Sequence, residues 1–176
     1  MKKFYTLFLA VLTAGTVAAK GMEISAGLVG GLGLGVQGKF MFTENLGLMD
    51  ELGYFMNLDG GTSNKYGFSS YAGLINNTTF VYQMPITEAQ GMSLDWYAGG
   101  QAKIGWMPMQ AGVFGLGAAG GIELKMKSAP IAVSFDFRPG WAMVFAGNEE
   151  GDLGIACHMF DYSFNLGVRY IIMGKK

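Results

Sequence analysis

Residues 160–172 read FDYSFNLGVRYII, and this segment alternates apolar and polar residues over almost its whole length. Its even-numbered positions carry the apolar and aromatic side chains Phe160, Tyr162, Phe164, Leu166, Val168, Tyr170 and Ile172. Its odd-numbered positions are polar or small as far as Arg169. A period of two predicts a β-strand with one apolar and one polar face. The run is also long enough to cross a bilayer as a tilted strand, which needs about 9–11 residues.

The same alternation recurs upstream and predicts seven further strands. We expect them at residues 22–29, 34–42, 46–56, 71–83, 94–106, 113–127 and 131–145. Gly30 to Gly33 predicts a tight reversal, because glycine reaches the positive φ angles that hairpin turns require. Asp50 interrupts the apolar face of its strand, so a bulge or a position at a membrane interface is expected there. The fold class predicted is all-β, an eight-stranded antiparallel up-and-down transmembrane β-barrel.

The links between the strands predict how such a barrel is oriented. Short links at 43–45, 84–93 and 128–130 would face the periplasm. The links at 30–33, 57–70, 107–112 and 146–159 would face the cell surface. A chain of 176 residues is within the range of one domain.

The N-terminus is typical of an export signal. Lys2 and Lys3 precede an apolar run from Phe4 to Leu12, and small residues follow as far as Ala19. This run is too short to cross a membrane as a helix. We expect a signal peptide at residues 1–19, cleaved after Ala19, and a barrel domain at residues 20–176. The predicted location is the bacterial outer membrane.

The composition restricts which partners, cofactors and metal sites can be expected. The net charge is −1 and only 14% of residues are charged, so a nucleic-acid partner is not expected. Cys157 is the single cysteine, which excludes an intrachain disulfide and offers no metal-site spacing. No cofactor and no metal site are predicted.

The polar faces of the strands carry many glycines together with eleven charged residues. These are Glu23, Lys39, Glu51, Asp95, Lys103, Glu123, Lys125, Asp136, Arg138, Asp161 and Arg169. The polar face could point outward, as in a soluble carrier with an apolar interior, or inward. An eight-stranded barrel is only just wide enough inside for side chains, so its interior favours small residues. The glycines therefore favour an inward polar face and a lipid-facing apolar face.

Aromatic residues on the apolar faces gather near the strand ends, as expected for an aromatic girdle at each membrane interface. They are Phe42, Tyr82, Trp96 and Tyr170 near one set of ends, and Trp106, Trp141, Phe160 and Tyr162 near the other.

Four segments resemble recurring motifs of small outer-membrane β-barrel proteins common in Bacteroidetes. The segments are KFMFTEN at 39–45, LDWYAGG at 94–100, PIAVSFDFRP at 130–139 and GVRY at 167–170. These barrels are similar in architecture to the membrane domain of outer membrane protein A and to outer membrane protein X. The resemblance implies an outer-membrane barrel but no agreed activity and no catalytic residues. Such barrels usually end on an aromatic residue, whereas this chain runs on to Lys176; Gly167, Tyr170 and Ile172 still fit a glycine-then-hydrophobic assembly signal.

The inward charges admit two interpretations. Six acids and five bases can pair across a narrow interior and seal it. Alternatively, a small gated ion pathway could run along Asp95, Lys103, Asp136, Arg138 and Arg169. A pore would require the paired network to break, because a barrel of eight strands has no aqueous lumen of the porin kind.

Two further classes of function can be compared with these. A lipid A-modifying enzyme could use His158 near the outer rim, but no serine or acid lies beside it at suitable spacing, so an interfacial side chain is expected. Residues 57–70 could serve surface adhesion, although this loop is short. Glu149, Glu150 and Asp152 could bind a divalent ion between lipopolysaccharide phosphates or simply be solvated.

We therefore expect a monomeric outer-membrane protein with a structural or envelope-maintenance role that is not an enzyme. Its expected partners are outer-membrane lipid and lipopolysaccharide, with periplasmic chaperones and the barrel-assembly machinery during biogenesis.

Overall fold

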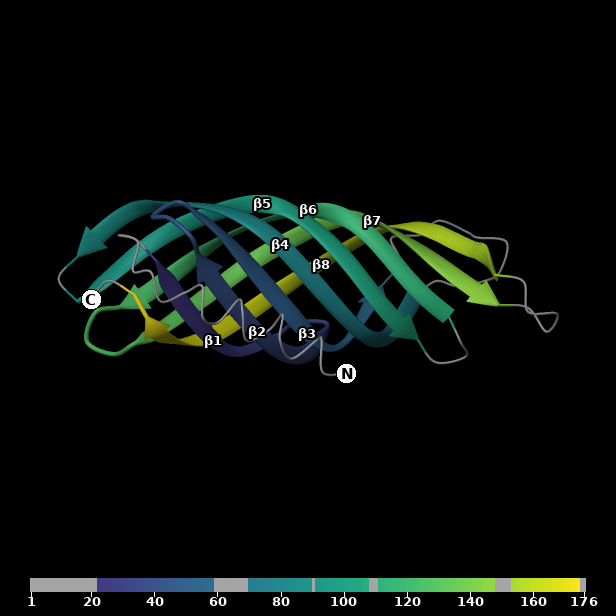
Figure 1. The fold of residues 1–176 in the computed structure, drawn as a ribbon, viewed down its shortest axis with the longest axis horizontal. Helices are drawn as coiled ribbons and strands as arrows, with labels where there is room; N and C mark the ends of the chain where they lie inside the picture. The colour runs from purple at the N-terminus through teal and green to yellow at the C-terminus, as the bar shows by residue number, and fades with distance from the viewer. Residues whose placement is uncertain (1–21, 59–69, 90, 108–110, 148–152, 175–176) are drawn as a thin grey trace, which may run out of the picture.

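A computed structural model describes residues 22–58, 70–89, 91–107, 111–147 and 153–174. Eight antiparallel strands close into one up-and-down barrel, in which each strand pairs with its neighbours in the chain and β1 pairs with β8 (Figure 1). The strands are β1 (Glu23–Gly30), β2 (Gly33–Met41), β3 (Leu46–Leu58), β4 (Ser70–Ala89), β5 (Met92–Met107), β6 (Ala111–Met126), β7 (Ile131–Gly147) and β8 (Leu153–Met173). The predicted fold class is confirmed. No helix among the described residues is long and apolar enough to cross a membrane.

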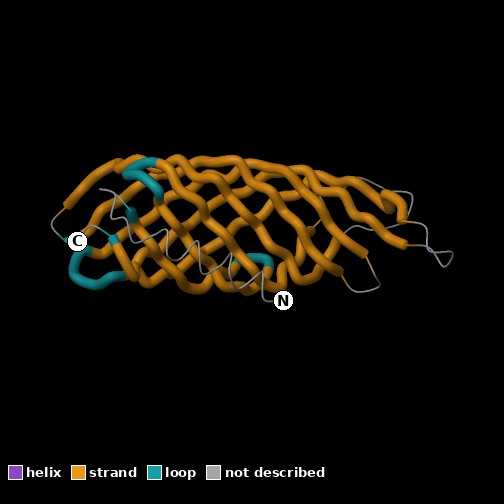
Figure 2. The backbone as a smooth tube through the Cα atoms, viewed as in Figure 1, coloured by secondary structure: helices purple, strands orange, loops and turns teal. Residues whose placement is uncertain are grey.

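The strands are strongly tilted and staggered. Following paired residues from Gly27 on β1 through each strand in turn leads to Met159 on β8. Gly27 itself pairs with Arg169, ten residues further along β8. A stagger of ten residues over eight strands corresponds to a tilt of roughly 40°, and the strands cross the wall diagonally in Figure 2. We call the end where β1 begins and β8 ends the proximal end, and the opposite end the distal end.

Inward-facing glycines let neighbouring strands approach closely. A methyl group on Gly105 would lie 2.8 Å from Ile75 Cγ1 and 2.9 Å from the Leu74 carbonyl oxygen. A methyl group on Gly140 would lie 2.8 Å from the Leu116 carbonyl oxygen. A side chain at either position would overlap atoms of the adjacent strands, so glycine is needed there.

The expected link at 84–93 is wrong, because both strands continue through it. β4 runs to Ala89 and β5 begins at Met92, so only residues 90 and 91 connect them. Pro85 is accommodated at a shift of register between Pro85 and Thr87, where the ladder needs no amide hydrogen from it. Gly91 has a φ of 97°, the positive value that a tight turn requires.

The expected loop at 146–159 is also wrong. β7 extends to Gly147 and β8 begins at Leu153, and the two strands project furthest at the distal end in Figure 1. Val144 pairs with Cys157 whereas Phe145 pairs with Ile155, so Ala156 is an extra residue in β8. This bulge interrupts the period of two, so the strand could not be recognised from the alternation of its residues. Residues 148–152 lie outside the described part of the chain.

The reversal between β1 and β2 lies where the sequence placed it, at residues 31–32. Its expected cause is wrong, because among the described glycines only Gly91 has a positive φ. A methyl group on Gly31 would lie 2.8 Å from Asn165 Oδ1. Glycine is therefore needed there for the close approach of the turn to β8.

Asp50 causes no bulge, although a bulge was one of the two alternatives expected there. The pairing of β3 with β2 and with β4 continues without a shift on both sides of Asp50. Its carboxylate lies on the outer face, where it accepts hydrogen bonds from Thr78 Oγ1 at 2.7 Å and Asn76 Nδ2 at 3.1 Å. Local polar partners, and not a change in register, accommodate the charge.

Candidate functional site

The interior of the barrel holds the eleven charged residues expected there. The period of two turns each of them toward the barrel axis, and their side chains are buried or half-buried. Every one of them takes part in at least one ion pair. The structure thus brings together residues from β1, β2, β3, β5, β6, β7 and β8 in one network, which we call the interior charge network.

At the proximal end the network is organised by Lys125 on β6. Its Nζ lies 2.6 Å from Glu23 Oε2, 3.4 Å from Asp95 Oδ2 and 3.5 Å from Glu123 Oε1. Gln83 Nε2 donates to Asp95 Oδ2 at 2.6 Å and to Glu123 Oε1 at 3.2 Å. One cation therefore neutralises part of three carboxylates around the proximal opening.

Glu123 is the centre of the next layer. Its carboxylate accepts from Lys39 Nζ at 3.0 and 2.9 Å and forms an ion pair with Arg169. All three side chains are almost completely excluded from solvent. An isolated buried charge is costly, so two buried cations on one carboxylate are tolerated only with further acceptors nearby. Gln37 and Gln83 supply these, accepting from Arg169 and Lys39 respectively.

Arg138 on β7 organises the third layer. Its guanidinium donates to Glu51 Oε1 at 2.6 Å and to Asp136 Oδ1 at 2.6 Å. Tyr97 donates its hydroxyl hydrogen to Asp136 Oδ2 at 2.6 Å, and Asn165 Nδ2 donates to Asp136 Oδ1 at 3.1 Å. Both carboxylates are thus saturated by fixed donors, which holds the arginine rigidly across the barrel.

The second and third layers are joined. Gln37 accepts from Arg169 and donates through Nε2 to Glu51, which pairs with Arg138. The interior charge network therefore runs without interruption from Lys125 near the proximal end to Asp136 in the middle of the barrel. Lys103 and Asp161 form a further ion pair on its distal side.

Little free volume remains among these groups. Cavities beside the Lys103–Asp161 pair measure ≈ 10 Å³ and ≈ 20 Å³. A single water needs about 10–15 Å³, whereas small-molecule sites measure about 300–1,000 Å³. These cavities can hold a water molecule but not a carried ligand.

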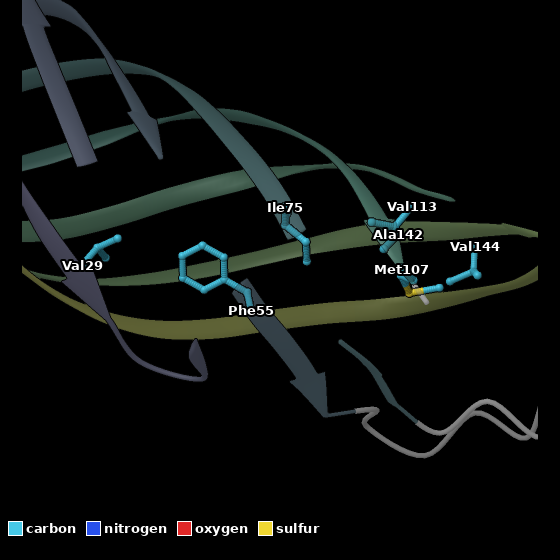
Figure 3. Packing of buried hydrophobic residues seen from close by; sticks show 7 residues of the cluster. All are labelled: Val29, Phe55, Ile75, Met107, Val113, Ala142 and Val144. Carbon is cyan, nitrogen blue, oxygen red and sulfur yellow. The ribbon is translucent and has the colours of Figure 1, made fainter. Parts of the chain in front are cut away.

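An apolar layer lines the distal half of the interior beside the Lys103–Asp161 pair, and sequence reasoning missed it. It consists of Val29, Phe55, Ile75, Met107, Val113, Ala142 and Val144, all under 8% exposed. Figure 3 shows these side chains spread along the barrel, with Val29 toward one end of the view, Val144 toward the other, and Phe55 and Ile75 between them. The signal was present, because Phe55 shares the inward parity of Glu51 on β3. The pattern alone did not show that Phe55 belongs to an apolar layer, because an apolar residue on a polar face could equally mark a shift of register.

Sequence reasoning also missed the neutral members of the network. Gln37, Gln83, Tyr97 and Asn165 are buried and connect the charged groups. Each lies at an inward position of its strand, so parity could have found them. Their partners lie on other strands and depend on the stagger of the barrel.

The outer face is apolar on every strand, and the eight girdle residues lie on it. Seven of them are at least 38% exposed, and Tyr162 is half-exposed. Rings are in contact in both groups. Tyr82 on β4 contacts Trp96 on β5 edge-on, with centroids 6.2 Å apart. Phe160 and Tyr162 lie on β8, also with centroids 6.2 Å apart.

Trp96 and Trp106 define the height of the outer apolar band. They lie on the same face of β5, ten residues apart. At about 3.3 Å per residue and a tilt of roughly 40°, their axial separation is about 25 Å. This equals the height of about 25 Å expected for the apolar band of an outer-membrane barrel.

The remaining predicted residues are placed as follows. Gly167 faces inward, where a methyl group would lie 2.6 Å from Ser134 Oγ, and Tyr170 and Ile172 face outward. His158 and Cys157 belong to β8, but their side chains lie outside the described part. Residues 1–21 and the acidic residues Glu149, Glu150 and Asp152 also lie outside it. Within the described ranges, no group of three or more His, Cys, Asp or Glu residues is placed to hold a metal ion.

Comparisons with protein-family models, with curated proteins and with solved structures find no match to this chain.

Proposed function

We propose that this chain is an integral outer-membrane protein with a structural, envelope-maintaining role and a sealed interior. Its polarity is inverted relative to that of a water-soluble protein, with charges inside and large apolar side chains exposed on every strand. Soluble monomers rarely expose apolar patches larger than a few hundred Å². A lipid environment accounts for such a surface, and closure of the barrel leaves no strand edge unpaired in the bilayer core.

The location in the outer membrane rests on three observations together. The N-terminal segment 1–19 is typical of an export signal, four segments resemble motifs of small outer-membrane barrels, and the apolar band has a height of about 25 Å. None of them depends on the others. Mass spectrometry of the outer-membrane fraction tests the location, with a mature N-terminus at Lys20 as the expected result.

The observation that carries the sealed interior is the uninterrupted contact from Lys125 through Glu123, Arg169, Gln37 and Glu51 to Arg138. An ion crossing the barrel would have to replace several buried, paired charges at once. It would also have to pass the apolar layer of Phe55 and its neighbours, which lies beside the Lys103–Asp161 pair. Paired charges and apolar side chains thus both narrow the path.

A small gated ion pore is the second candidate, favoured by the column of charged side chains along the axis. The two candidates differ in the conductance of the refolded mature chain in a planar bilayer. We expect no current from the native sequence. Discrete current steps in the native protein would contradict the sealed interior and support the pore.

Variants identify which layer seals the barrel. Glu51→Ala, Asp136→Ala and Arg138→Ala together remove one charged layer and leave no unpaired charge in it, although Gln37, Tyr97 and Asn165 lose an acceptor. Phe55→Ala with Ile75→Ala thins the apolar layer. Because both layers narrow the path, we expect the combined variant to leak more than either set alone. Resistance of each folded variant to sodium dodecyl sulfate before heating controls for misfolding.

A further inference from the structure

The outer face has one polar cluster, formed by Asp50 on β3 and by Asn76 and Thr78 on β4. Thr78 Oγ1 and Asn76 Nδ2 donate to the Asp50 carboxylate, and Asp50 is exposed. These three are the polar side chains without an aromatic ring that face outward between the two aromatic groups, among the described residues.

The cluster lies at mid-height of the apolar band. Asp50 pairs with Thr78, and Thr78 pairs with Ala102, which lies between Trp96 and Trp106 on β5. On β3 the cluster has Leu48 on its proximal side and Leu52 on its distal side. A carboxylate facing lipid is least tolerated at this depth, because lipid offers no donor and little polarisation.

The cluster is flanked on both sides by outward glycines that no steric crowding requires. Gly38 pairs with Asp50 from β2, and Gly100 lies two residues from Ala102 on β5. A methyl group on either would meet no atom within 4 Å. The inward glycines are explained by crowding, whereas these two are not. Small outward residues let the backbone of a neighbour approach closely, as at membrane interfaces.

The opposite wall at the same height is large and aromatic. Phe135 and Phe137 on β7 pack against Phe164 on β8, with centroids 6.3 and 4.8 Å apart. Leu166 and Val168 beside them are about half exposed. The polar cluster itself lies on β3 and β4, and the small outward residues around it extend from β2 to β6, where Ala118 and Gly120 pair with Gly100 and Ala98.

We propose that this surface binds a second copy of the same chain within the membrane. This inference rests on the proposed membrane location and departs from the expectation of a monomer. All copies in one membrane share one orientation, so a pair is related by a two-fold axis along the membrane normal. An axis between β3 and β4 sets Asp50 of each copy against Asn76 and Thr78 of the other.

The surface is complementary to itself under this symmetry. The carboxylate of each copy gains donors from the other, and the like charges stay on opposite sides of the axis. Gly38 of one copy lies opposite Gly100 of the other at similar depth, and neither carries a side chain that would hold the two polar clusters apart. A partner of another kind would need its own donors at this depth, whereas a second copy already carries them.

Cysteine cross-linking tests the pair with two matched leucines. The mature chain with Cys157→Ser is inserted into lipid vesicles, carrying either Leu52→Cys beside the cluster or Leu166→Cys on the opposite wall. Both leucines face outward and are about half exposed, at 47% and 54%. We expect Leu52→Cys to form at least about five-fold more disulfide-linked dimer, and to retain this yield after ten-fold dilution with lipid.

Two further variants show whether the cluster causes the pairing. Asp50→Leu and, separately, Gly100→Leu are each expected to lower the Leu52→Cys yield to the level of Leu166→Cys. The outward Gly112→Leu, outside the surface, is expected to leave it unchanged. Asp50→Leu should not lower the fraction of folded barrel, because it removes a charge from lipid.

The result that overturns the pair is equal, dilution-sensitive cross-linking at the two cysteines in protein that has entered the membrane. Dimers that survive both Asp50→Leu and Gly100→Leu would also overturn it. Vesicle flotation is measured first, because protein that remains outside the vesicles contradicts the proposed membrane location instead. Cross-linking of monomers through Leu52→Cys to another protein in native membranes would show that the surface binds a different partner.

Discussion

Arg138 on β7 donates to the carboxylate of Glu51 on β3, with Nη2 2.6 Å from Oε1 and both side chains almost completely buried. The two residues are 87 positions apart in the chain. They meet because the stagger of the barrel brings their inward positions to neighbouring heights on opposite sides of the axis. The pair is therefore a property of the closed barrel and not of either strand.

Loss of Arg138 is expected to be far more costly than loss of an exposed cation. Arg138→Ala leaves two buried carboxylates without their cation, and we expect the free energy of unfolding to fall by about 3–5 kcal/mol. Lys127 pairs with Glu88 at 3.1 Å in largely exposed positions. Lys127→Ala should change stability by about 0.5 kcal/mol or less. Urea unfolding in lipid vesicles measures both, and similar losses would show that the interior pair is not buried as described.

Acids in the network are expected to differ according to the number of cations they hold. Glu123→Gln removes the charge that both Lys39 and Arg169 contact, and a loss of about 3–5 kcal/mol is expected. Glu23 forms an ion pair with Lys125, at 14% side-chain exposure, and Lys125 keeps Asp95 as a partner. Glu23→Gln should therefore cost about 1 kcal/mol or less. A reversed order would mean that the centre of the network lies elsewhere.

Inward and outward glycines are expected to respond differently to an added methyl group. Gly105→Ala would place Cβ within 2.9 Å of three atoms on neighbouring strands, and overpacking of this kind costs about 1–3 kcal/mol. Gly112→Ala on the outer face meets its nearest atom at 3.7 Å and should be nearly neutral. Thermal unfolding of the two single variants in the same lipid distinguishes them, and equal melting temperatures would contradict the crowding.

Tryptophan fluorescence can test the orientation of the apolar band in a bilayer. Variants keeping only Trp96 or only Trp106 are expected to be quenched best by lipids brominated near the headgroup. In a background lacking native tryptophan, Leu166→Trp should be quenched best by lipids brominated near the chain ends, because it faces outward between the two girdles. Strong deep quenching of Trp96 or Trp106, or none at Leu166→Trp, would contradict a membrane-spanning barrel of this height.

The number of strands, their approximate positions and the face of each residue could be predicted from the sequence alone. Alternation is a local property, since successive side chains point to opposite faces of a strand. It placed Lys39, Glu123, Arg138 and Arg169 on one face correctly. The alternation failed at Pro85 and Ala156, because one extra residue in a bulge moves every later residue of the strand to the opposite face.

Which inward residues touch each other was decided only by the tertiary structure. The stagger of ten residues over eight strands fixes the height of each strand relative to the others, and no single strand encodes that number. It joins Arg138 to Glu51, places Glu123 between Lys39 and Arg169, and gathers Phe55, Ile75 and Val144 into a distal apolar layer. The sequence by itself determined an eight-stranded pattern with a charged face. Closure of the barrel decided that the charges form one paired network, because only closure brings opposite walls within hydrogen-bonding distance.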